Sequence, residues 1–268
     1  MTNTSSESEP KTPGTKLQIS KSPKYWGPVA ATMWPVLIWV AAQVVVGVLL
    51  LAYAATQHWT DKQTNAWLDT SVAAQFIFTL IVESLILVAV LQLLRHYKAA
   101  VKVIGLLKPR LKDVPIALIG FGAYFVAYIV LVAVAQQVFP SLNLNQKQDI
   151  GFQDATSVLQ LSMTFISLVI LPPITEEILF RGFAFTGFRR KFGFVIATLA
   201  TSILFAIPHL LESKGGGGLL WIAGIDTFIL SFVLCFLREK TGRLVPGMGV
   251  HALKNFIAFV SLFILQTH

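Results

Sequence analysis

Residues 158–188 read VLQLSMTFISLVILPPITEEILFRGFAFTGF. This stretch is long and apolar enough to cross a bilayer as a helix, because a span needs roughly 20 predominantly apolar residues. Its centre nevertheless carries two adjacent carboxylates, Glu176 and Glu177, and a guanidinium group on Arg181. A charged side chain at the middle of a bilayer costs roughly 2.5–3.5 kcal/mol even on the most lenient scale. We therefore expect these residues to face a protein interior or a water-filled cavity and to have a function there.

The composition is that of an integral membrane protein. Of the 268 residues, 55% are hydrophobic and only 13% are charged, whereas about 25% of the residues are charged in a typical soluble domain. The formal net charge of +8 would suit a nucleic-acid partner in a soluble protein. Here, however, the basic residues flank apolar stretches, which indicates a role in membrane orientation. We expect the lipid bilayer as a partner and no nucleic acid.

The apolar stretches predict an all-α fold, a polytopic bundle of transmembrane helices. Seven stretches are long enough to span a bilayer, at about residues 27–55, 71–94, 115–138, 158–188, 194–212, 219–237 and 244–265. Residues 1–24 are rich in Ser, Thr, Pro and Lys and predict a disordered tail. Residues 25–268 then form the transmembrane domain.

The distribution of positive charge predicts the orientation of this bundle. Most of the 21 Lys and Arg fall before the first span and in every second connection after it, whereas the alternate connections hold only Lys62, Lys147 and Lys214. The positive-inside rule therefore predicts a cytoplasmic amino terminus and an external carboxyl terminus. Residues 97–112 mix Val, Ile and Leu with Lys and predict an interfacial helix on the cytoplasmic face.

The charged residues of the fourth span predict a division of roles. Glu177 and Arg181 are four residues apart with the acid first, so on a helix they share a face and can pair. Glu176 is rotated by about 100° from its neighbour and is left for chemistry, such as that of a general base. The competing interpretation is a structural ion-pair cluster that holds helices together.

Two later spans carry further polar residues at helical spacing. His209 follows Phe205 by four residues, and taken alone it is most simply explained as an interhelical hydrogen-bond partner. His251 and Asn255 are also four apart, so both side chains can point at one place. Their N–H groups are suited to stabilise an oxyanion that develops on a peptide carbonyl.

Together these residues form three short motifs that resemble, in order, those of the CPBP family. The family comprises CAAX prenyl endopeptidases and bacteriocin-processing, Abi-type intramembrane proteases. The motifs are Glu176-Glu177-x-x-x-Arg181, Phe205-x-x-x-His209 and His251-x-x-x-Asn255. The resemblance covers about residues 155–262, which we interpret as the catalytic core.

The resemblance implies an intramembrane endopeptidase. Glu176 and His209 would activate a water, His251 and Asn255 would form the oxyanion hole, and the pair of Glu177 and Arg181 would support them. The substrate would be a peptide or a membrane protein, prenylated or not. The resemblance also implies eight spans, where the hydropathy of this chain indicates seven. Oligomeric state is not predicted.

Metal dependence stays open at this point. Glu176, His209 and His251 could ligate Zn²⁺ as a His₂Glu set with an open position. The chain has no His-Glu-x-x-His helix, however, and a metal-free mechanism leaves each residue one clear role. We favour the metal-free mechanism, with no cofactor.

The alternative function is a membrane transporter or scaffold that uses buried charges as a proton or ion path. It would give a role to three further charged residues within spans: Glu83, Asp226 and Lys254. Transporters often contain internal repeats, and no repeat stands out here.

The start of the seventh span determines how deeply His251 can lie. Leu244-Val245-Pro246-Gly247 combines a residue that favours helix starts with one that permits unusual backbone. We predict that residues 243–247 enter the bundle as extended chain and that the helix begins near Pro246.

Overall fold

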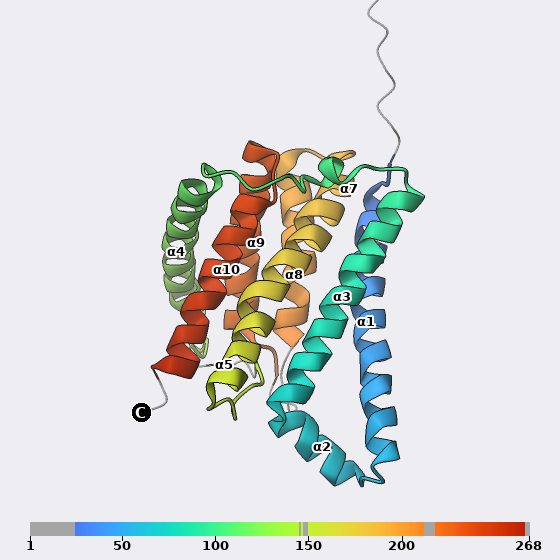
Figure 1. The fold of residues 1–268 in the computed structure, drawn as a ribbon. Helices are drawn as coiled ribbons and strands as arrows, with labels where there is room; N and C mark the ends of the chain where they lie inside the picture. Colours follow the sequence, from blue (N-terminus) through green and yellow to red (C-terminus); the bar gives the residue numbers. More distant parts are fainter. Residues whose placement is uncertain (1–24, 145, 147–149, 212–217, 266–268) are drawn as a thin grey trace, which may run out of the picture.

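The computed structural model describes residues 25–144, 146, 150–211 and 218–265, and this part of the chain is helical, without strands. Seven segments are long and apolar enough to cross a membrane, and they lie side by side as a bundle (Figure 1). They are Pro28–Thr56 (α1), Val72–His96 (α3), Asp113–Val138 (α4), Val158–Arg189 (α5 to α7), Phe194–Leu211 (α8), Trp221–Thr241 (α9) and Val245–Ile264 (α10 and η5). The predicted fold class and number of spans are confirmed. The predicted tail at residues 1–24 lies outside the described residues, as do Lys147 and Lys214.

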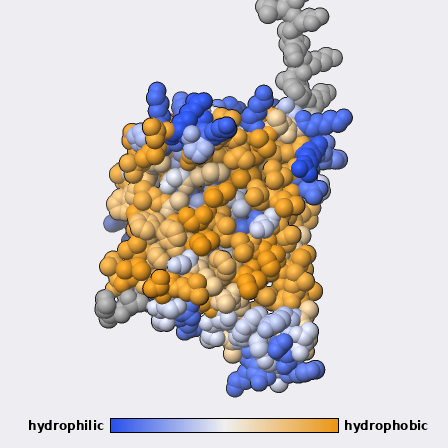
Figure 2. All heavy atoms as spheres, in the orientation of Figure 1, coloured by the Kyte–Doolittle hydropathy of each residue, from blue (hydrophilic) through white to orange (hydrophobic). Residues whose placement is uncertain are grey.

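The surface of the bundle fits a bilayer. Apolar side chains form a band around its middle, and hydrophilic side chains gather above and below this band (Figure 2). α1 begins on the side of the band where α10 also begins, and α10 ends on the other side (Figure 1). A short amphipathic helix, Asp61–Thr70 (α2), connects α1 to α3 on that other side and starts with a capping box at Thr60. The chain is thus a multi-pass integral membrane protein, while the direction of insertion stays a prediction.

The fourth span is not a regular α-helix. It consists of Val158–Phe165 (α5), the π-helical Ile166–Ile170 (η2), Leu171–Glu176 (α6), the π-helical Glu177–Ala184 (η3) and Phe185–Arg189 (α7). Pro172 and Pro173 have no backbone N–H, so the carbonyl groups one turn earlier lose their usual donors. The wide turn η2 immediately precedes these prolines. Wide turns inside α-helices occur often at functional sites, and η3 begins at Glu177.

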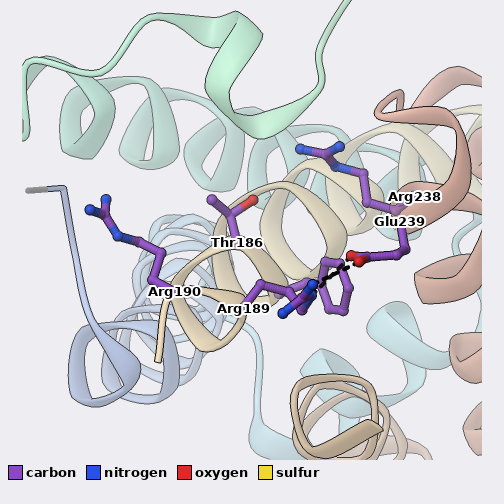
Figure 3. Close-up of a pocket in the computed structure, with 6 residues that line it drawn as sticks. Thr186, Arg189, Arg190, Arg238 and Glu239 are labelled. Carbon is purple, nitrogen blue, oxygen red and sulfur yellow. Dashed lines mark hydrogen bonds and ion pairs between the residues drawn. The ribbon is translucent and has the colours of Figure 1, made fainter. Parts of the chain in front are cut away.

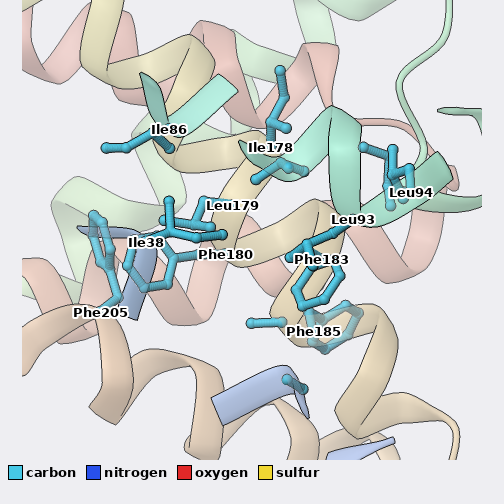
Figure 4. Close-up of a cluster of buried hydrophobic side chains, with 14 of the residues drawn as sticks. Ile38, Ile86, Leu93, Leu94, Ile178, Leu179, Phe180, Phe183, Phe185 and Phe205 are labelled. Atoms are coloured by element: carbon cyan, nitrogen blue, oxygen red, sulfur yellow. The ribbon is translucent and has the colours of Figure 1, made fainter. Parts of the chain in front are cut away.

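The widened fourth span packs into the centre of the bundle. Ile178, Leu179, Phe180 and Phe183 are buried among side chains of α1, α3 and α8 (Figure 4). Trp26, which precedes α1, stacks on Phe183 with ring centroids 4.4 Å apart and donates its Nε1–H to the Phe183 carbonyl at 2.8 Å. On the opposite side α10 packs against η2, α6, α4 and α9. The seventh span is therefore held against the charged part of the fourth.

Two predictions about connections were wrong. Residues 97–112 form only one helical turn, the 3₁₀ segment Val101–Ile104 (η1), because Gly105 takes the left-handed conformation at φ 79° and ends it. Residues 243–247 are not extended: α9 ends at Thr241, Gly242 turns the chain at φ 68°, and α10 begins at Val245. The predicted helix start near Pro246 is confirmed. The extended entry is not needed, because the left-handed Gly242 reverses the chain in fewer residues.

Candidate active site

The first element of the site is a fully buried ion pair. Arg181 Nη1 lies 2.7 Å from Glu177 Oε1, and their side chains are 0% and 1% exposed. The guanidinium also lies over the Phe205 ring, 4.3 Å from its centroid, which favours the cation in a desolvated place. The predicted pairing is therefore present, within η3 of the fourth span.

His251 lies between the two adjacent carboxylates. Its Nε2 is 3.7 Å from Glu176 Oε2, and its Nδ1 is 3.5 Å from Glu177 Oε1. The Glu176 side chain keeps 21% of its exposure, whereas the His251 side chain keeps 5%. Glu176 is thus the carboxylate of this group that water can reach. Sequence reasoning predicted that the two acids have different partners, and it missed that both meet one imidazole.

Gly247 makes room for this arrangement. It lies one turn before His251 on α10, and a Cβ atom at this position would come within 2.9 Å of Glu177 Oε2. Real Cβ atoms do not approach an oxygen so closely, so any larger residue would displace the carboxylate. The sequence suggested Gly247 as a source of unusual backbone. The structure gives it a different role, because it is an ordinary helical residue that lies against a buried charge.

Asn255 is positioned by the irregular turn η2 of the fourth span. Its Nδ2 donates a hydrogen bond to the Leu168 carbonyl at 2.8 Å. In a regular helix that carbonyl would accept from residue 172 or, in a π-turn, from residue 173. Both are prolines, so neither can donate. Asn255 therefore supplies a missing donor to η2, and its Nδ2 carries a second N–H.

His209 reaches the group through Phe205. The centroids of the Phe205 and His209 rings are 5.2 Å apart. The Phe205 ring also meets the His251 ring edge-on, with centroids 6.0 Å apart. His209 Nδ1 lies 3.1 Å from the Phe205 carbonyl. A carbonyl only accepts, so this bond needs the proton on Nδ1 and leaves Nε2 as the proton acceptor of the neutral ring. Phe205 thus connects His209 of the fifth span with His251 of the seventh.

A zinc site with an open position needs three protein ligands. Among the described residues, which include Glu176, His209 and His251, no group of three His, Cys, Asp or Glu side chains is placed to hold a metal ion. No step below is routed through a metal, and metal dependence stays a question for experiment.

Three further charged residues within spans, Glu83, Asp226 and Lys254, have partners other than the candidate site residues. Glu83 of α3 accepts a hydrogen bond from the Thr175 hydroxyl, and thereby ties α3 to α6 beside Glu176. Lys254 Nζ lies 2.9 Å from Asp226 Oδ2, and the Tyr124 hydroxyl donates to the other oxygen of that carboxylate. These contacts connect α4, α9 and α10.

Comparisons with known proteins match the part of the chain that holds this site. Residues 158–257 match a family described as type II CAAX prenyl endopeptidase Rce1-like. This part of the chain is thus similar to the Rce1-like family. The match starts at α5 and ends within α10, so it contains the candidate site residues Glu176, Glu177, Arg181, His209, His251 and Asn255.

Two curated relatives cover a larger share of the chain. The uncharacterized protein YyaK of Bacillus subtilis (strain 168) is 29% identical over 148 residues, which are 55% of this chain and 47% of that protein. The UPF0177 protein YxdF of Lactococcus lactis subsp. lactis (strain IL1403) is 28% identical over 141 residues, which are 52% of this chain and 71% of that protein. The alignment thus spans about half the length of YyaK. No solved structure matches the chain.

Proposed function

We propose that this protein is an intramembrane endopeptidase that uses Glu176 as its base and needs no metal. The observation that carries the proposal is the 3.7 Å approach of Glu176 Oε2 to His251 Nε2, with Glu176 still 21% exposed. Peptide hydrolysis needs a base and a hydrogen-bond donor that reach one carbonyl group from neighbouring positions. Catalytic contacts are often long before the substrate binds and shorten in the complex.

In the first step a water attacks the substrate carbonyl carbon. Glu176 takes a proton from that water, and His209, with Nε2 as its acceptor, assists in holding the water. The negative charge then moves to the carbonyl oxygen. In the second step the tetrahedral intermediate collapses, the C–N bond breaks, and the proton held by Glu176 passes to the leaving amine.

The oxyanion of that intermediate needs donors that are in place beforehand. In the proposed mechanism His251 donates through Nε2–H and Asn255 through its second Nδ2–H, while its first bonds the Leu168 carbonyl. The buried pair of Glu177 and Arg181 contributes indirectly, because Glu177 lies 3.5 Å from His251 Nδ1. In this scheme the ring is protonated on both nitrogens, so that Nδ1–H faces the Glu177 carboxylate and Nε2–H is left to donate to the oxyanion.

The alternative of a transporter or scaffold is less well supported. Its three additional charged residues are Glu83, Asp226 and Lys254. Each is tied to a neighbouring helix by a side-chain contact, through Thr175 for the first and through one shared ion pair for the other two. Such contacts suit links between helices, whereas a proton path needs groups that change partners. The substrate we propose is a peptide or the tail of a membrane protein, and prenylated CAAX peptides are the first candidates.

The test is cleavage by the purified protein in detergent. A library of peptides with and without a C-terminal prenylated cysteine is incubated with the parental protein and with the Glu176→Gln variant. Gln keeps the volume but cannot take the proton, so we expect cleavage to fall by roughly 10²–10⁴-fold. The matched control is Glu83→Gln, which removes another buried carboxylate but still lets Thr175 donate to an oxygen. Parental rates in Glu176→Gln would contradict the mechanism. Charge-dependent ion flux in liposomes without any cleavage would favour the transporter.

A further inference from the structure

A basic pocket lies at the end of the bundle where α7 and α9 finish. It has a volume of about 290 Å³, is open to the surface, and is lined by Phe185, Thr186, Arg189, Arg190, Arg238 and Glu239. In Figure 3 Arg190 and Arg238 lie on either side of Thr186, while Arg189 and Glu239 are joined to each other. None of these residues belongs to the site proposed for peptide hydrolysis.

The pocket lining has more positive than negative charge. Glu239 is held by Arg189 through two contacts, Nε to Oε2 at 3.0 Å and Nη2 to Oε1 at 2.7 Å. This pair is internally balanced, and it leaves two further guanidinium groups in the lining. Arg238 gives one hydrogen bond, from Nη2 to the Val103 carbonyl at 3.2 Å, while its buried Nε has no acceptor among the described residues. The lining therefore carries an excess of positive charge that suits an anion.

The surroundings of the pocket are those of a membrane interface. Arg189 is the last residue of the apolar fourth span, and Arg190 directly follows it. The Arg190 guanidinium lies 5.1 Å from the centroid of Tyr25, and Tyr25 is next to Trp26. The pocket thus lies at the end of an apolar span, where a membrane protein usually meets the lipid head groups. Basic pockets between transmembrane helices are typical sites for anionic head groups.

An apolar path leads from the pocket toward the lipid-facing surface. Phe185, in the pocket lining, meets Phe194 edge-on at 6.5 Å, and Phe194 meets Phe236 at 6.4 Å. Phe236 of α9 is 44% exposed and carries Lys240 over its ring at 5.6 Å. A ligand with a phosphate in the pocket could lay a hydrocarbon chain along these rings. A free phosphate ion would gain nothing from them.

We propose that this pocket binds the phosphate of an anionic membrane lipid. Arg238 and Arg190 supply the charge, the Thr186 hydroxyl supplies a further donor, and an acyl chain lies against Phe194 and Phe236. The volume of about 290 Å³ lies near the lower end of the range for small-molecule sites, about 300–1,000 Å³, and suits a head group whose acyl chains lie outside the pocket. This proposal is independent of the peptidase activity.

Native mass spectrometry of the protein released from nanodiscs tests the proposal. The nanodiscs contain phosphatidylcholine with increasing phosphatidylglycerol, and the measurement is the occupancy of bound phosphatidylglycerol. The variant combines Arg190→Gln with Arg238→Gln. The control combines Lys102→Gln with Lys112→Gln, two exposed residues on the same end of the bundle that remove the same charge outside the pocket. At about 1 kcal/mol for each basic residue near anionic lipid, we expect a weakening of roughly thirty-fold in the first variant only.

A single variant and a competition experiment complete the test. Arg190→Gln alone leaves the Val103 contact of Arg238 intact, and we expect it to weaken binding by about five-fold. Inorganic phosphate and glycerol phosphate are added as competitors, and we expect neither to displace the lipid at equal concentration. Equal lipid occupancy in the pocket variants and the control would overturn the proposal. Competition by inorganic phosphate as effective as that of the lipid would also overturn it, in favour of a free-anion site.

Discussion

Asn255 donates its side-chain amide to the Leu168 carbonyl at 2.8 Å, across the interface of the seventh and fourth spans. The prolines at 172 and 173 leave that carbonyl without its usual backbone donors. One irregularity in the fourth span thus orients a residue of the seventh. The same contact leaves the second N–H of the amide for the substrate in the proposed mechanism.

This relationship predicts the effect of removing the amide. Asn255→Ala and Asn255→Asp both lack the N–H donors, and loss of one oxyanion donor typically costs roughly 10²–10³ in kcat. We expect kcat to fall by this amount with little change in KM, as measured with the best substrate from the peptide library. A loss confined to KM would mean that Asn255 binds the ground state and does not stabilise the oxyanion.

Gly247 offers a test of the space around Glu177. In Gly247→Ala the new Cβ would lie 2.9 Å from Glu177 Oε2, so the carboxylate has to move relative to Arg181 and His251. We expect lower thermal stability in detergent and a loss of activity. Gly122→Ala in α4 is the matched control, because a Cβ there meets nothing within 4 Å. A helical Gly→Ala change at such an open place should be neutral or stabilise by roughly 0.5–1 kcal/mol. The same behaviour in both variants would show that the carboxylate has room to adapt.

The buried pair of Glu177 and Arg181 predicts a difference between a single and a double substitution. Arg181→Ala leaves a 1% exposed carboxylate without its cation, and breaking such a pair costs roughly 3–5 kcal/mol. The double variant Glu177→Gln with Arg181→Met removes both charges, so we expect it to give more folded protein than Arg181→Ala. The amount of folded protein is measured by size-exclusion chromatography, and its melting temperature by thermal unfolding. If the two variants are equally impaired, the loss comes from packing against Phe205 and not from the stranded charge.

The orientation in the membrane can be tested without reference to chemistry. In a background with Cys235, which is buried, replaced by Ala, single cysteines are introduced at Lys102 and at Lys62. The positive-inside rule predicts that the cysteine at 102 is protected from impermeant thiol reagents in intact cells and that the cysteine at 62 is labelled. Both should react after the cells are opened. The reverse pattern would invert the topology and put the basic pocket on the external face.

The sequence alone determined the number and positions of the membrane spans. Hydrocarbon selects for long apolar stretches regardless of what surrounds them, so the seven helices could be located from composition alone. Helical spacing also predicted that Glu177 meets Arg181, because that contact lies within one helix. The candidate residues were found because charged and polar groups are costly within spans.

The tertiary structure decided how these residues meet. That His251 lies between Glu176 and Glu177 depends on how α10 packs against the fourth span, which no local pattern encodes. The contact of Asn255 with Leu168 and the close approach of Glu177 to Gly247 arise where two spans meet. The connections at 97–112 and 243–247 were predicted wrongly, because left-handed glycines at 105 and 242 fix their paths. A sequence records which residues are costly to bury, whereas the distances that make them a site come from the packing of separate helices.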